Sequence, residues 1–156
     1  MDFLSVYQAG VPNAAATLGT ALAEGQVRLI RPYAREAVLN FDRDAAGVSA
    51  ARRAIQVLLG EGLRIRVISV PDGKDPDEFI RLEGPEAYAD LVKCAVPFFS
   101  FLVEQSRGVL SRKDVEGKVA FLEDVVPYLT AVAYPIERQE YAKEVAGRAG
   151  LDLGLV

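Results

Sequence analysis

The spacing of apolar residues along the first part of the chain predicts a mixture of strands and helices. Residues 37–41 form a mostly apolar run that predicts a buried strand, and residues 63–70 alternate between apolar and polar side chains, which predicts a second strand near a sheet edge. Between them, residues 45–59 carry apolar side chains at helical spacing and predict an amphipathic helix. We expect further helices over residues 2–8, 21–30, 77–82 and from Pro85 onward, and a short strand over residues 13–18.

The second part of the chain has the pattern of helices alone. The helical stretches cover residues 95–105, 114–129 and 136–149. They are separated by Gly108, Pro127 and Pro135, residue types that interrupt helices. Because no strand pattern lies among them, we predict an α/β unit over residues 1–91 followed by a helical unit over residues 92–156.

Composition narrows the chemistry that these units can carry. The apolar fraction of 51% suffices for a core, yet no apolar run reaches the roughly 18 residues of a membrane span, and the start lacks a positively charged signal segment. A single cysteine, Cys94, excludes an internal disulfide framework and fits a reducing cytosol, so we expect a cytoplasmic protein. The lack of histidine excludes a Ser-His-Asp triad and the usual zinc sites. With a net charge of −4, a nucleic-acid role would need metal ions, a basic patch or a neighbouring domain.

Two pairs of aspartates follow the two predicted strands. Asp42 and Asp44 come after the first strand, and Asp75 and Asp77 come after the second. In extended backbone, residues two apart point to the same side, and open α/β sheets bind their ligands at the carboxyl ends of the strands. Carboxylate oxygens are ligands that Mg²⁺ prefers, so the pairs predict a metal site for phosphoryl-transfer chemistry. The alternative is structural, because such aspartates also form turns and cap helices, with Asp77 as the cap of the helix that follows.

The residues around these pairs resemble a known family. The segment from Asn40 to Gly47 looks like the Asp-x-Asp motif of the Toprim domain, and that from Val70 to Arg81 resembles the later acidic motif of bacterial replicative DNA primases. The segments 8–10, 15–22, 84–88 and 95–97 are similar to the same primases in the same order. The resemblance therefore covers almost the whole chain.

This resemblance implies a fold and an activity. It implies an α/β Toprim-like, mostly parallel sheet flanked by helices, followed by an all-helical subdomain of the primase core. Primases are DNA-dependent RNA polymerases that make short RNA primers at the bacterial replication fork. The resemblance implies nucleotidyl transfer from ribonucleoside triphosphates on a single-stranded DNA template, assisted by two or more Mg²⁺ or Mn²⁺ ions. Such an enzyme is cytoplasmic and has no membrane partner.

The family's functional residues carry over to particular positions. Those that match its metal-binding aspartates are Asp2, Asp42, Asp44, Asp75 and Asp77, of which Asp42 and Asp44 are also the expected catalytic residues. Two cations beside them, Arg43 and Lys74, are weaker candidates for a contact with nucleotide or nucleic acid.

The chain also departs from the family pattern at its start. Only Met1 and Asp2 of the first Toprim motif are present, so we expect its glutamate and the first strand to lie upstream. We likewise expect the zinc-binding domain and the domain that binds the replicative helicase to lie outside this chain. We therefore expect a fragment that does not synthesise primers alone. The alternatives are another Toprim enzyme, such as a nuclease or topoisomerase, and an inactive module that binds metal or a partner.

Overall fold

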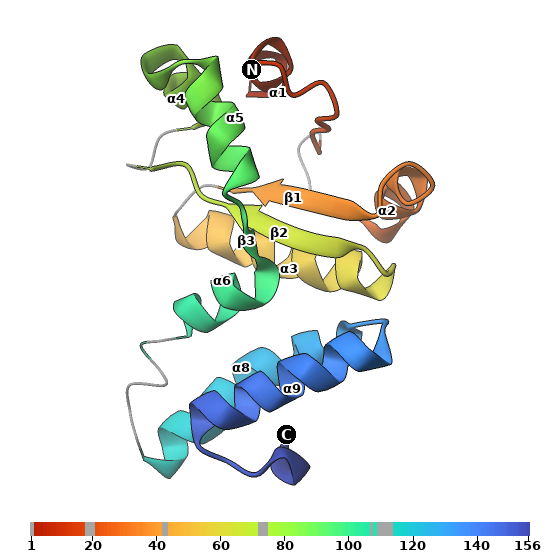
Figure 1. Ribbon diagram of the computed structural model, residues 1–156, viewed down its shortest axis with the longest axis vertical. Coiled ribbons are helices and arrows are strands. Elements are labelled where there is room, and N and C mark those ends of the chain that lie inside the picture. Colours follow the sequence, from red (N-terminus) through yellow and green to blue (C-terminus); the bar gives the residue numbers. More distant parts are fainter. Residues whose placement is uncertain (1, 18–20, 42–43, 72–74, 107, 109–113) are drawn as a thin grey trace.

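The computed structural model describes residues 2–17, 21–41, 44–71, 75–106, 108 and 114–156. In chain order the elements are α1 (Asp2–Gln8), α2 (Glu24–Ile30), β1 (Glu36–Asn40), α3 (Ala45–Gly60), β2 (Arg64–Ile68), α4 (Pro76–Glu83), α5 (Pro85–Lys93), β3 (Val96–Pro97), α6 (Phe98–Gln105), α8 (Val115–Ala131), α9 (Pro135–Ala149) and η2 (Leu153–Leu155). The predicted α/β part followed by helices is confirmed (Figure 1).

The described sheet has the strand order β1-β2-β3. β1 and β2 are parallel, in a register that runs from Glu36 opposite Arg64 to Asn40 opposite Ile68. β3 is antiparallel to β2, and the Arg66 guanidinium strengthens this side of the sheet because its Nε donates to the Ala95 carbonyl at 2.9 Å. The parallel pair requires the crossover that α3 provides.

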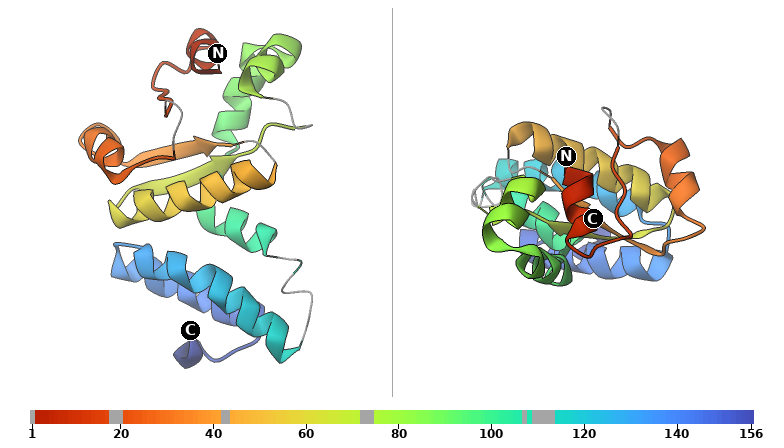
Figure 2. Two further views of the ribbon diagram at one scale, coloured as in Figure 1. Left: turned by 180° about the vertical axis from the view of Figure 1, so that it is seen from behind. Right: turned by 90° about the horizontal axis from the view of Figure 1, so that it is seen from above.

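Helices cover the sheet on both sides (Figures 1 and 2). Alternate residues of β2 face opposite sides, so Ile65 and Val67 enter the larger core, formed with α3, α6, α8 and α9, whereas Ile68 enters a smaller one with α1, α4 and α5. Phe99 and Phe121 are among the fully buried side chains of the larger core. Because this core includes residues of both the α/β part and the helical part, the two parts pack as one body.

Several details differ from the sequence prediction. Within the predicted strand over 13–18, the described residues 13–17 form no strand, and helix α2 begins at Glu24, three residues later than expected. β2 is the middle strand of the described sheet, and the two-residue strand β3 lies in the part that we expected to be purely helical. Pro127 lies inside α8 and does not end it, because packing of the flanking Val125, Tyr128 and Leu129 outweighs the loss of one helical hydrogen bond. No described helix has the length and apolar character that crossing a membrane requires.

Candidate functional site

The two predicted aspartate pairs come after the carboxyl ends of β1 and β2 in the chain. Because the two strands are parallel, Asn40 and Ile68 end at the same edge of the sheet. The chain leaves this edge toward α3 after β1 and toward α4 after β2. Asp44 is the residue immediately before α3, and Asp75 is the residue immediately before α4.

Asp44 and Asp75 share one local geometry, that of a helix N-cap. The Asp44 Oδ1 accepts a hydrogen bond from the Gly47 amide at 2.5 Å, and the Asp75 Oδ1 accepts one from the Glu78 amide at 2.6 Å. Each cap satisfies an amide that the helix leaves without a partner and places the carboxylate at the positive end of the helix. Since each cap engages one oxygen of a group that can accept several bonds, the capping role and a metal-binding role are compatible. The structural alternative considered from the sequence placed the cap of α4 at Asp77; this is wrong, because Asp75 occupies that position.

Asp77 lies in the first turn of α4 and faces α1. Its Oδ1 accepts a hydrogen bond from the Ser5 hydroxyl, although the two residues are 72 positions apart in the sequence. Helix α1 begins at Asp2, whose side chain is exposed. The Ser5 bond therefore joins the helix that carries Asp2 to the helix that carries Asp77.

Tyr88 of α5 fixes the end of β1. Its hydroxyl accepts a hydrogen bond from the Asn40 Nδ2 at 3.1 Å, and its ring is buried against Phe79 of α4. Burial and the negative charge of Asp2 raise the pKa of the Tyr88 hydroxyl, against the lowering effect of the Asn40 bond. Asn40, Tyr88 and Asp2 thus lie in one neighbourhood at this edge of the sheet.

The predicted residues Asp42, Arg43 and Lys74 lie outside the described residues. Within the described ranges, no three Asp, Glu, His or Cys side chains gather closely enough to hold a metal ion. The described aspartates therefore do not form a complete metal site by themselves. Their donor chemistry nevertheless fits Mg²⁺ or Mn²⁺, since all of them offer carboxylate oxygens and no sulfur or imidazole.

Three residues of this neighbourhood were not among the sequence predictions, namely Ser5, Asn40 and Tyr88. Asn40 carried a signal, because it is a polar residue at the last position of a strand that precedes an acidic loop. Tyr88 lies in the segment 84–88 that resembles primases, but the sequence indicated the contacts of neither Tyr88 nor Ser5, because their partners are distant in the sequence.

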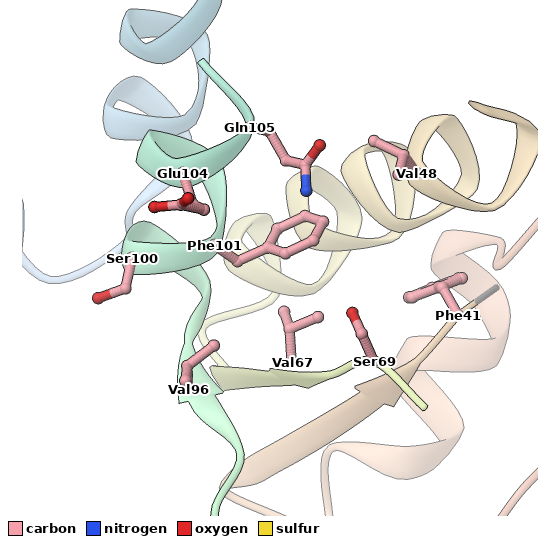
Figure 3. Close-up of a pocket in the computed structure, with 9 residues that line it drawn as sticks. All are labelled: Phe41, Val48, Val67, Ser69, Val96, Ser100, Phe101, Glu104 and Gln105. Atoms are coloured by element: carbon pink, nitrogen blue, oxygen red, sulfur yellow. The ribbon is translucent and has the colours of Figure 1, made fainter. Parts of the chain in front are cut away.

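Two hollows lie within the part of the chain that the structure describes. The larger, of about 490 Å³, lies between the sheet, the start of α3 and α6, and Figure 3 shows Phe101 and Val67 projecting into it. Phe41, the residue after β1, forms one wall. The smaller hollow, of about 290 Å³, lies between α1 and α4 and is lined by Ser5, Asp77 and Arg81 among others. The smaller hollow is therefore the one that adjoins a predicted site residue.

Comparisons with known proteins agree over nearly the whole chain. The sequence pattern of the Toprim-like family matches residues 1–80, and that of the DnaB-helicase binding domain of primase matches residues 99–154. The DNA primase of Clostridium acetobutylicum is 35% identical over 151 residues, which are 97% of this chain and 25% of that protein. This chain spans about a quarter of the length of the curated relatives that it matches.

Solved structures give the same result. A DNA primase domain from Pseudomonas aeruginosa is similar with a TM-score of 0.86 and 29% identity, over 98% of this chain and 49% of that one. A DnaG primase catalytic domain bound to single-stranded DNA has a TM-score of 0.86 and 27% identity, over 99% of this chain and 50% of that one. Both similarities include the sheet, the helices around the candidate site and the helical part.

The match over residues 99–154 bears on one expectation. We expected the domain that binds the replicative helicase to lie outside this chain, whereas a pattern with that description matches α6, α8 and α9 within it. The expectation of its absence is therefore not supported. The sequence alone gave no sign of this, because the helical part shows only packing residues at helical spacing.

Proposed function

This chain belongs to the Toprim-like family, and we propose that it is the Toprim and helical part of the catalytic core of a bacterial DNA primase. The proposed parent enzyme is a DNA-directed RNA polymerase that makes RNA primers for DNA replication in the cytoplasm. The observation that carries the proposal is the similarity to primases over nearly the whole chain, in sequence and in structure. The position of two aspartate-capped helices after the parallel strands supports it.

Divalent metal use is general among Toprim primases, and the residues that would hold Mg²⁺ or Mn²⁺ here are Asp2, Asp42, Asp44, Asp75 and Asp77. When bound, such ions activate a hydroxyl nucleophile and neutralise phosphate charge. The caps at Asp44 and Asp75 hold these two carboxylates in fixed orientations before any ligand arrives. Arg43 and Lys74 are proposed to contact the nucleotide phosphates, because cations beside metal-binding carboxylates attract anionic substrates.

The proposed partners are single-stranded DNA, ribonucleoside triphosphates and the replicative helicase. The similar primase domain that was solved with single-stranded DNA supports the first. The match of residues 99–154 to a helicase-binding pattern supports the last, and we propose that the helical part of this chain contributes to that contact. Zinc would be bound by another domain of the parent protein, since this chain has no histidine and a single cysteine.

The alternative Toprim activities are not favoured, because the relatives and the solved structures described above are primases. The chain alone is proposed to be inactive, since it corresponds to about half of a primase catalytic core. Template-directed dinucleotide formation by the purified chain would contradict this part of the proposal.

Primer synthesis by the parent enzyme tests the proposal. Asp44→Asn and Asp75→Asn each replace one carboxylate by an amide that still caps a helix, so the fold is retained while a metal ligand is lost. Asp114→Asn is a matched control, because the Asp114 Oδ1 caps α8 through the Gly117 amide at 2.7 Å, far along the chain from the sheet edge. We expect primer synthesis on single-stranded DNA to fall by two orders of magnitude or more in the first two variants, in line with losses of catalytic charge stabilisation, and to persist in the control. Equal activity in all three variants would overturn the proposal.

A further inference from the structure

We propose that Ser5 is a positioning residue for Asp77, and that its hydroxyl orients this carboxylate for binding a divalent cation. The inference rests on the proposed function of the aspartates at this edge. It concerns a residue that neither the acidic motifs nor the family resemblance singled out. Its basis is the hydrogen bond that joins α1 to α4.

The bond fixes a carboxylate that would otherwise rotate. The Ser5 hydroxyl donates to the Asp77 Oδ1 from a half-buried position. Since Asp77 has no role as the cap of α4, which Asp75 performs, the backbone of α4 does not hold its carboxylate. The bond engages one carboxylate oxygen of Asp77 and leaves the other available to a metal ion. Hydrogen-bond partners outside the metal's own ligands commonly orient metal-binding carboxylates in this way.

The same bond sets the relation between two candidate ligands. Ser5 lies one helical turn after Asp2 on α1, and Asp77 lies in the first turn of α4. Joining the two helices at this point brings the start of α1 and the start of α4 into a defined arrangement. Helix α5 agrees with this placement, because its Tyr88 packs with Val6 of α1 and Phe79 of α4 in the smaller core.

The two helices have other contacts that hold the fold without Ser5. Val6 of α1 and Phe79 of α4 are both buried in the smaller core together with Tyr88. Ser5, in contrast, lines the hollow of about 290 Å³ between the helices, together with Gln8, Asp77 and Arg81. Removing the Ser5 hydroxyl therefore changes the orientation of Asp77 more than it changes the packing of α1.

Manganese titration of the chain tests this role. Free Mn²⁺ is followed by its electron paramagnetic resonance signal in the wild type, Ser5→Ala, Ser5→Thr and a control, Ser100→Ala, which alters an exposed serine of α6. We expect Mn²⁺ affinity to fall about tenfold in Ser5→Ala, at the lower end of the range for outer-shell partners. Ser5→Thr retains a hydroxyl and is expected to stay within about twofold of the wild type, like the control, by the same principle.

The outcomes separate the two proposals. If Ser5→Ala binds Mn²⁺ with wild-type affinity, or if Ser5→Thr and Ser5→Ala lose the same Mn²⁺ affinity, Ser5 does not position Asp77. Either result would still be compatible with the proposed metal site. No Mn²⁺ binding by the wild type would overturn the metal site itself. Thermal unfolding of Ser5→Ala serves as a check on folding, since alanine is a better helix former than serine and α1 keeps its apolar contacts.

Discussion

The ion pair between Arg52 of α3 and Asp124 of α8 stabilises the contact between the α/β part and the helical part. The Arg52 Nη2 donates to the Asp124 Oδ2 at 2.9 Å, the Nη1 bonds to the other oxygen, and the Ser106 hydroxyl also donates to Asp124. The two side chains are only 22% and 30% exposed, so the pair is partly desolvated. We expect Arg52→Ala to lower the free energy of unfolding by about 2 kcal/mol, between the values for exposed pairs and for fully buried pairs.

Urea denaturation followed by circular dichroism measures this loss. A change of 2 kcal/mol corresponds to a fall of roughly 4–8 °C in the melting temperature of a chain of this size. The double mutant Arg52→Ala/Asp124→Ala should show a coupling energy of about 1–2 kcal/mol, because the two residues are in direct contact. Arg148→Ala is the control, since its pair with Glu144 is 42% exposed on both sides and should contribute less than about 0.5 kcal/mol.

The same pair predicts how stability depends on pH. Burial raises the pKa of Asp124, but the hydrogen bonds from Arg52 and Ser106 outweigh it, so the pKa is lowered in the folded state. A lowered pKa means that the stabilisation is fully present above the ordinary carboxyl pKa of about 4 and is lost as the pH falls through the folded value. The stability difference between the wild type and Asp124→Asn should therefore shrink in acid.

The stabilising role of the pair would be refuted if Arg52→Ala lost no more unfolding free energy than Arg148→Ala and showed no coupling to Asp124.

Two further changes test the helix caps and the core. Asp44→Ala removes the bond to the Gly47 amide and should cost about 0.5–2 kcal/mol in unfolding free energy, whereas Asp44→Asn should cost much less, and equal losses in chemical denaturation would argue against the cap. Phe99 is 1% exposed and its ring stacks on Tyr141 of α9 with centroids 4.9 Å apart, so Phe99→Ala should cost about 3–5 kcal/mol, and a loss below 1 kcal/mol would contradict its place in the core.

The sequence predicted the larger elements because their patterns are local. The apolar spacing over residues 45–59 corresponds to α3, and the run at 37–41 corresponds to β1 with a shift of one residue. Strand β3 has only two residues, which are too few to show an alternating pattern, and it pairs with a strand that is distant in the sequence. The proline at position 127 was misleading for a similar reason, since tertiary packing maintains α8 around it.

The candidate site was only partly predictable. The sequence shows that each aspartate pair follows a strand. It does not show that Asp75 caps α4 while Asp77 bonds to Ser5, because these roles depend on where α4 begins and where α1 packs. The link between Asn40 and Tyr88 joins residues 48 positions apart, and neither sequence spacing nor charge indicates it. The positions of Asp44 and Asp75 at helix starts explain why the capping and metal-binding interpretations could not be separated from the sequence.

Mn²⁺ titration of variants that keep the helix caps shows whether the aspartates after β1 and β2 bind a divalent metal ion. Asp44→Asn and Asp75→Asn retain caps at α3 and α4, and Asp114→Asn does the same at α8. We expect the wild type and Asp114→Asn to bind Mn²⁺ with equal affinity. Asp44→Asn and Asp75→Asn should bind it at least about tenfold more weakly, because each loses a carboxylate ligand. Equal Mn²⁺ binding by all four proteins, or no binding by the wild type, would contradict metal binding by these aspartates.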